Sequence, residues 1–235
     1  MITLSDAHQQ FIGHLKGRAR ASATILAYGK DIEQLVDFLV KKTKINVDQV
    51  ASEDLQEFMN TLQQEGYTAK SISRKTNSTK TFFKFLKTSN LIQENPANSI
   101  EHPKFENKPP RILSKIEYRA LRDAARGDLR IFAIIELLLQ TGIRIGELAN
   151  LKVEDMKLDD DTPTLFVAPN EGSVSRTIPL NRPAVEAVRK YLEIRPRTAS
   201  QALFVTKTGR PLLVRNIRTA IDRYFRLADI KGAKV

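Results

Sequence analysis

The sequence predicts a mainly α protein with a small β-sheet, made of a helical domain at 1–102, a linker at 103–110 and an α+β domain at 111–235. Three observations support this fold class. Apolar residues recur at helical spacing along most of the chain. The segment 103–110 is rich in proline and charge, so it is not a continuous helix. Residues typical of strands gather only in the second half, at 163–180 and 202–205.

Four helices are expected in the first domain. The apolar repeats and the polar residues that begin helices place them at 3–17, 24–41, 53–64 and 69–87. The second is the clearest, because its apolar residues keep to one face over five turns. Four helices with one apolar face each suffice to enclose a common core.

The fourth expected helix, 69–87, is strongly basic. Between Glu65 and Glu94 the sequence has no acidic residue, but it has six cations: Lys70, Arg74, Lys75, Lys80, Lys84 and Lys87. Such a helix fits a DNA groove, with cations on phosphates and small polar residues on base edges. DNA contacts are therefore predicted at Lys70, Arg74, Lys75, Asn77 and Lys80. The alternative is a solvated basic face.

In the second domain, a buried helix is predicted to lead to Arg144. Residues 131–139 are almost entirely apolar, and Thr141 and Gly142 interrupt the run before the next apolar repeat begins at Ile145. Arg144 is thereby expected in the first turn of a new helix, where a guanidinium beside free N–H groups is suited to holding a phosphate. The alternative is an ordinary surface ion pair between Arg144 and Glu147.

The remaining elements of the second domain follow in order. Ser114 with Glu117 forms a capping-box pattern that begins a helix. A β-hairpin is expected over 163–180 with its turn at 169–172, then a helix over 183–192, a short edge strand at 202–205 and a basic amphipathic helix over 214–227. The last helix is expected to direct its arginines outward: Arg215, Arg218, Arg223 and Arg226.

The charge of the chain indicates a polyanionic partner. The net charge is +11, and its distribution is uneven. Residues 1–110 hold 15 Lys and Arg against 12 Asp and Glu, whereas residues 111–235 hold 23 against 15. Clustering of this kind favours nucleic acid over a general effect on solubility.

Composition also excludes several classes of site. The chain has no cysteine, so it has no disulfide, thiol nucleophile or Cys-ligated metal. His8, His14 and His102 are scattered through the first part of the chain, so no metal site and no cofactor are expected. No apolar run is long enough for a membrane span and no secretory pattern is present, so we expect a cytoplasmic protein without a membrane partner.

Residues 141–156, TGIRIGELANLKVEDM, resemble the first conserved box of the tyrosine recombinase (phage integrase) family, TG-x-R-x-x-EL followed by L-x-x-x-D. The segments TILAYGKDIEQLVDFL and SISRKTNSTKTFFKFL resemble the N-terminal core-binding (SAM-like) domain of its Xer-type members. The resemblance implies a site-specific DNA recombinase that cleaves and rejoins strands through a 3′-phosphotyrosine, with Arg144 as a catalytic residue. It also implies two domains forming a C-shaped clamp around a pseudo-palindromic duplex, other protomers on the same DNA, and DNA contacts at Arg74, Lys75 and Lys80. Further DNA contacts are expected at Arg176, Arg215 and Arg218.

The sequence departs from the family pattern at two places. Arg176-Thr-Ile-Pro-Leu180 matches the R-x-[VI]-P-L string of the hairpin, but Val174 occupies the place of the family's catalytic lysine, which removes that general acid. Lys207 is the alternative source of an ammonium. The chain stops at Val235, before the family's H-x-[LW]-R box and nucleophilic tyrosine. We therefore expect the 235 residues to bind DNA without cutting it, either as a shortened form of a working recombinase or as a non-catalytic relative.

A different functional class competes with this interpretation. A helical module that binds RNA or another protein, or binds DNA without catalysis, would share the helical pattern. Against it, the sequence has no RNP-like aromatic strand, no KH-type GXXG loop and no repeat of fixed period. The target sequence and the biological task, chromosome dimer resolution or element mobility, are not encoded in these motifs.

Overall fold

A computed structural model describes residues 1–18, 21–104, 106, 109, 111–158, 161–169 and 174–233. The chain divides into two compact units, Met1–Lys108 and Pro109–Val235. The division falls within the segment 103–110. None of the described helices combines the length and the hydrophobicity needed to cross a membrane.

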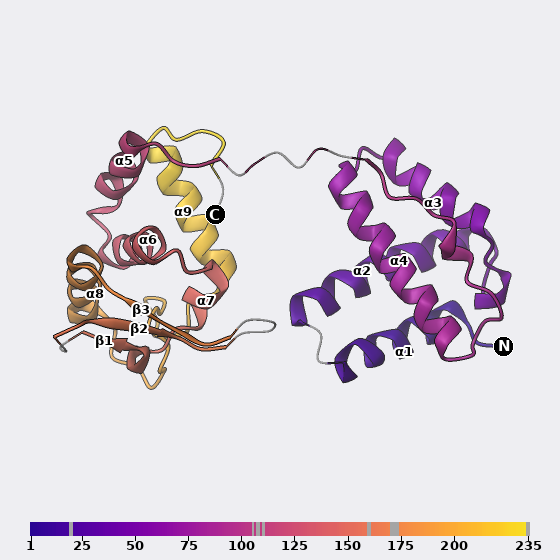
Figure 1. Ribbon diagram of the computed structural model, residues 1–235, viewed down its shortest axis with the longest axis horizontal. Coiled ribbons are helices and arrows are strands. Elements are labelled where there is room, and N and C mark those ends of the chain that lie inside the picture. Colours follow the sequence, from indigo (N-terminus) through magenta and orange to yellow (C-terminus); the bar gives the residue numbers. More distant parts are fainter. Residues whose placement is uncertain are drawn as a thin grey trace. The chain divides into compact units, whose positions relative to one another are not determined.

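The first unit is helical, as the sequence predicts. Its α-helices are α1 (Leu4–Gly17), α2 (Ser22–Lys41), α3 (Ser52–Gln64) and α4 (Ala69–Thr88), with short 3-10 turns at Val47–Gln49 and Pro96–Asn98. Helix α4 packs against the other three, which places it at the centre of the unit (Figure 1).

The core of this unit is aromatic. Phe11 of α1 meets Phe82 of α4 edge-on, with ring centroids 5.3 Å apart, and Phe82 in turn contacts Phe83. All three are completely buried. Edge-to-face pairs of this kind stabilise a core beyond the area that they bury, so α4 is anchored along its length by its apolar face.

The second unit joins helices to a small sheet. Its helices are α5 (Lys115–Ala125), α6 (Leu129–Thr141), α7 (Ile145–Asn150), α8 (Arg182–Ile194) and α9 (Val214–Leu227), with a 3-10 turn at Val153–Asp155. The strands β1 (Met156–Lys157), β2 (Thr164–Val167) and β3 (Arg176–Pro179) form an antiparallel sheet in that order, with Leu165 opposite Ile178. The mainly α fold with a small sheet is thus confirmed.

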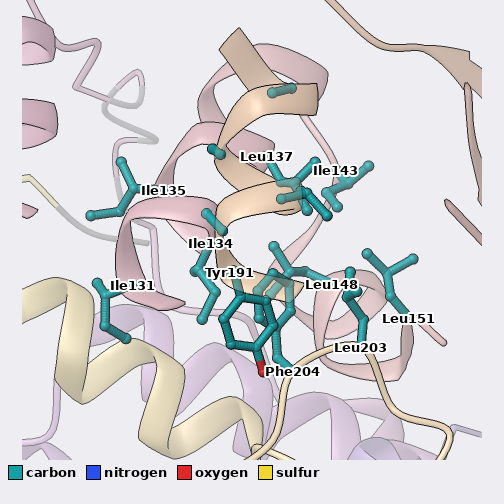
Figure 2. Packing of buried hydrophobic residues seen from close by; sticks show 14 of the residues in the cluster. Ile131, Ile134, Ile135, Leu137, Ile143, Leu148, Leu151, Tyr191, Leu203 and Phe204 are labelled. Atoms are coloured by element: carbon teal, nitrogen blue, oxygen red, sulfur yellow. The ribbon is translucent and has the colours of Figure 1, made fainter. Parts of the chain in front are cut away.

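Helix α6 is the centre of the second unit, surrounded by α5, α8 and α9 (Figure 1). Figure 2 shows Ile131, Ile134 and Leu137 of this helix within the cluster. Deeper in the core, Tyr191 of α8 stacks on Phe204 at 5.2 Å, and its hydroxyl accepts a hydrogen bond from the main-chain N–H of Val205. The buried helix predicted before Arg144 is confirmed.

One local prediction is wrong, one strand was missed, and one predicted turn is not tested. Residues 202–205 do not form an edge strand: only the isolated bridges Lys152↔Ala202 and Val205↔Pro211 occur there. The hairpin has a third strand, β1, whose two residues are too few to give a period-two pattern. The expected turn at 169–172 lies mostly outside the described residues.

Candidate nucleic-acid interface

Arg144 links the buried helix α6 to the short helix α7. Gly142 ends α6 with a φ of +65°, a conformation that favours glycine, and Arg144 is the N-cap of α7. It therefore lies one residue before the first turn in which the sequence placed it. Its side chain is 75% exposed. Because α7 has only six residues, the positive charge here comes mainly from the guanidinium itself.

Glu147 fixes the position of Arg144. Its buried carboxylate accepts a hydrogen bond from the main-chain N–H of Arg144 at 2.8 Å and another from Arg144 Nη1 at 3.2 Å. The ion pair that was the alternative for Arg144 is thus present. The ion pair leaves most of the Arg144 side chain exposed. Glu147 therefore fixes the position of Arg144 while its guanidinium stays accessible to a phosphate.

The same carboxylate also binds Arg176 of β3. Arg176 donates from Nη1 and Nη2 to the two oxygens of Glu147 at 2.9 and 2.8 Å, a bidentate geometry. These hydrogen bonds, opposed by burial, lower the pKa of Glu147 from 4.5 to about 2. The Arg176 guanidinium is engaged in tying the sheet to α7, so we do not retain it as a DNA contact.

The depressed pKa of Glu147 predicts a pH-dependent stability. A carboxylate with a lowered folded-state pKa stabilises the protein fully above its ordinary value of 4.5, and this contribution disappears as the pH falls toward about 2. Glu147→Gln should therefore destabilise the second unit by about 2 kcal/mol at neutral pH and by much less near pH 2. Urea unfolding at both pH values measures this, with Glu154→Gln, which removes an exposed ion pair to Lys152, as the control.

In the first unit, α4 carries the predicted basic residues, and the structure separates them. Lys70, Arg74 and Asn77 are exposed and Lys80 is half-buried, but Lys75 is buried. The small polar residues Thr76, Ser78 and Thr79, which the sequence suggested as DNA donors, are buried too. Thr76 and Ser78 each donate back to a carbonyl of α4.

Lys75 belongs to a buried network around Asp31 of α2. Its ammonium lies 3.0 Å from Asp31 Oδ1 and 2.6 Å from Gln34 Oε1. Ser78 donates to Asp31 at 3.1 Å, and Arg74 pairs with the same carboxylate while its side chain stays 45% exposed. The predicted DNA contact of Lys75 is therefore not supported: this lysine joins α4 to α2. Arg74 still presents part of its guanidinium to solvent.

Two further cations of α4, Lys80 and Lys84, border a basic hollow shared with α1. Its volume is about 440 Å³, and we call it the α1–α4 hollow. It is lined by His14, Arg18, Asn77, Lys80, Thr81, Lys84, Phe85 and Thr88. Two of the predicted residues, Asn77 and Lys80, thus meet two that were not selected, Arg18 and Lys84. In the sequence, Arg18 begins a short basic stretch, Arg18-Ala-Arg20, directly after α1, and this stretch could have indicated it as a DNA contact.

In the second unit, Arg215 and Arg218 lie on the exposed side of α9, as predicted. Ile217, Ile221 and Phe225 bury the opposite side. Tyr224 is also buried, at 7% exposure, so it belongs to the core as expected and not to a reactive surface.

Two positions bear on the missing lysine, Val174 and Lys207. Val174 is 82% exposed, and Ser173 is outside the described residues. Lys207 lines a hollow with Arg130 and Arg223, whereas Arg144 lines a different, largely apolar one of about 490 Å³ with Arg111 and Phe225. Lys207 thus does not replace the family's lysine in this arrangement.

Comparison with known proteins agrees with this geometry. The phage integrase family matches residues 111–234, more than half of the chain, and the N-terminal SAM-like domain of phage integrase matches residues 9–90. The chain belongs to the phage integrase family. The resemblance to tyrosine recombinases inferred from residues 141–156 is confirmed.

Among its relatives is tyrosine recombinase XerD of Rickettsia bellii, which is 30% identical over 83% of this chain and 64% of its own length. Tyrosine recombinase XerC of Alcanivorax borkumensis is 29% identical over 94% of this chain and 75% of its own. The chain thus spans 64% to 75% of these relatives. A lambda integrase dimer bound to a COC' core site shares the fold, with a TM-score of 0.79 at 19% identity over 99% of this chain and 84% of that one.

Proposed function

We propose that this protein is a DNA-binding form of a site-specific DNA recombinase, in which Arg144 holds the phosphodiester that working members of the family cut. The observation that supports this most directly is an exposed guanidinium fixed by a buried carboxylate, Glu147, in a family member whose relatives include XerD and XerC. Arginine is suited to this role because its fork neutralises charge that develops on phosphate oxygens.

The DNA contacts that we propose come from both units. In the first unit they are the exposed residues Lys70, Arg74 and Asn77 and the half-buried Lys80, together with Arg18 and Lys84 of the α1–α4 hollow. In the second unit they are Arg215 and Arg218. The substrate is a pseudo-palindromic duplex in the cytoplasm, contacted by residues of each unit and shared with other protomers.

Binding selection from a pool of random duplexes tests this function. The 235-residue chain should enrich pseudo-palindromic sites with arms of about 10 bp, and its affinity for them should fall steeply with salt. It should form no covalent adduct with DNA, because its 235 residues contain no H-x-[LW]-R box and Tyr224 is buried. Equal affinity for single-stranded RNA and duplex DNA would instead favour the RNA-binding alternative.

Arg144→Ala is expected to remove one local contact. Interference mapping with ethylated phosphates should show that one phosphate per arm loses its effect on binding, while the overall affinity changes by about threefold or less. Arg144→Lys should retain part of the effect, because the charge remains but the bidentate fork is lost. Weakened protection across the whole site would contradict a role at a single phosphodiester.

A further inference from the structure

A second basic hollow in the second unit shares no described lining residue with the hollow at Arg144. It lies where the start of α6, the turn at 206–209 and the solvent side of α9 meet, and its volume is about 480 Å³. We call it the α6–α9 basic pocket. Four cations line it: Arg130 of α6, Lys207 of the turn, and Arg223 and Arg226 of α9.

The positive charge of this pocket exceeds its acidic charge, because four cations and one acid, Asp128, line it. Among the described residues, the side chains of Lys207 and Arg226 have no ion-pair or hydrogen-bond partner. The Arg223 guanidinium lies over the ring of Tyr224 and donates a hydrogen bond to its hydroxyl. The lining acid, Asp128, is occupied as the cap of α6, where it accepts a hydrogen bond from the N–H of Ile131 at 3.1 Å. An excess of cations over acids attracts anions to the hollow between them.

Hydrogen-bond donors in the pocket also lack acceptors. Arg130 donates from Nη1 to the carbonyl of Val205 at 3.0 Å, but its Nε is buried without a partner in the described part of the chain. Asn216, which is exposed, lines the same pocket, and its side-chain amide has no partner among the described residues. Buried donors are nearly always satisfied in folded proteins. A phosphate, whose oxygens accept several hydrogen bonds at once, suits such donors directly or through a bridging water.

In a neighbouring hollow of the same unit, most of the lining cations form ion pairs with carboxylates. This hollow measures about 600 Å³ and is also lined by four cations: Arg122, Arg126, Arg182 and Lys190. There, Arg122 pairs with Glu136, Arg126 with Asp123 and Arg182 with Glu186. Basic composition alone therefore does not distinguish the α6–α9 basic pocket; the absence of carboxylate partners around it does.

We propose that the α6–α9 basic pocket binds a phosphate group. Two sources of that group fit the same chemistry: a backbone phosphate of duplex DNA, and a free inorganic phosphate or pyrophosphate. This proposal is independent of the recombinase function. Phosphate binding in the pocket requires neither Arg144 nor strand exchange.

Two charge-matched double variants of the 235-residue chain test the proposal. Lys207→Gln with Arg226→Gln removes two unpaired cations from the α6–α9 basic pocket. Arg126→Gln with Lys190→Gln removes the same charge from the neighbouring hollow. Each protein is titrated with sodium pyrophosphate by calorimetry and with a short duplex by fluorescence anisotropy, and circular dichroism checks that both variants are folded.

The expected result is a loss of affinity of about tenfold or more in the first variant and about twofold or less in the second. A selective loss for the duplex alone assigns the site to the DNA backbone, and a selective loss for pyrophosphate alone assigns it to a free phosphate. Equal losses in the two variants, or no loss in the first with either ligand, would overturn the proposal. Because neither variant touches Arg144 or the α1–α4 hollow, either of these last results leaves the recombinase function to be tested separately.

Discussion

Asp31→Asn is expected to lower the opening free energy of helices α2 and α4 by about 3 kcal/mol, because it leaves the Lys75 ammonium buried without its counter-ion. Asparagine is nearly isosteric, so the cost comes from charge and not from a cavity. Hydrogen exchange followed by mass spectrometry on peptides from the two helices measures the change. Peptides from the second unit serve as an internal reference.

Two further variants separate charge from packing. Glu33→Gln, two residues from Asp31 on α2, breaks an exposed pair with Lys30 and should cost about 0.5 kcal/mol or less. Adding Lys75→Met to Asp31→Asn removes both buried charges and should recover much of the loss. If Glu33→Gln costs as much as Asp31→Asn, or if the second substitution recovers nothing, the buried ion pair is not what joins α4 to α2.

The fold was predictable because its signals are local. Apolar residues recur every three to four positions along each helix. The helix ends are marked by single residues, such as Ser114, which caps α5, and Gly142, which ends α6. Arg144 was identifiable for the same reason: the break between two apolar repeats lies within a few residues of it. Strand β1 escaped prediction because two residues are too few to show an alternation.

What the sequence could not show is which charges are already paired. Lys75 and Arg176 both belong to basic motifs, yet Lys75 meets Asp31 from another helix, and Arg176 meets Glu147, 29 residues earlier. Contacts between residues so far apart in the sequence cannot be predicted from the spacing of apolar residues or from the charge of neighbouring residues. The same reasoning explains why Arg18 and Lys84 were missed: only the packing of α1 on α4 brings them together with Asn77 and Lys80.

Lys80→Gln combined with Lys84→Gln should weaken duplex binding by about 10- to 100-fold near 0.1 M salt. Both lysines border the α1–α4 hollow, neither has an ion-pair partner among the described residues, and they are one helical turn apart on α4. Each phosphate contact releases counter-ions, so the slope of log affinity against log salt should become less steep by about 2. Fluorescence anisotropy at several salt concentrations measures both quantities.

The slope distinguishes phosphate contacts from a general loss of positive charge. Lys30→Gln with Lys41→Gln removes the same charge from α2 at exposed positions outside the hollow, so it should change the slope by well under 1. A similar change in slope for both pairs would mean that the first unit attracts DNA only through its net charge. A change confined to Lys80 and Lys84 would mean that α4 lies within a few ångströms of the backbone, because screening over a Debye length of about 8 to 10 Å suppresses contributions from farther away.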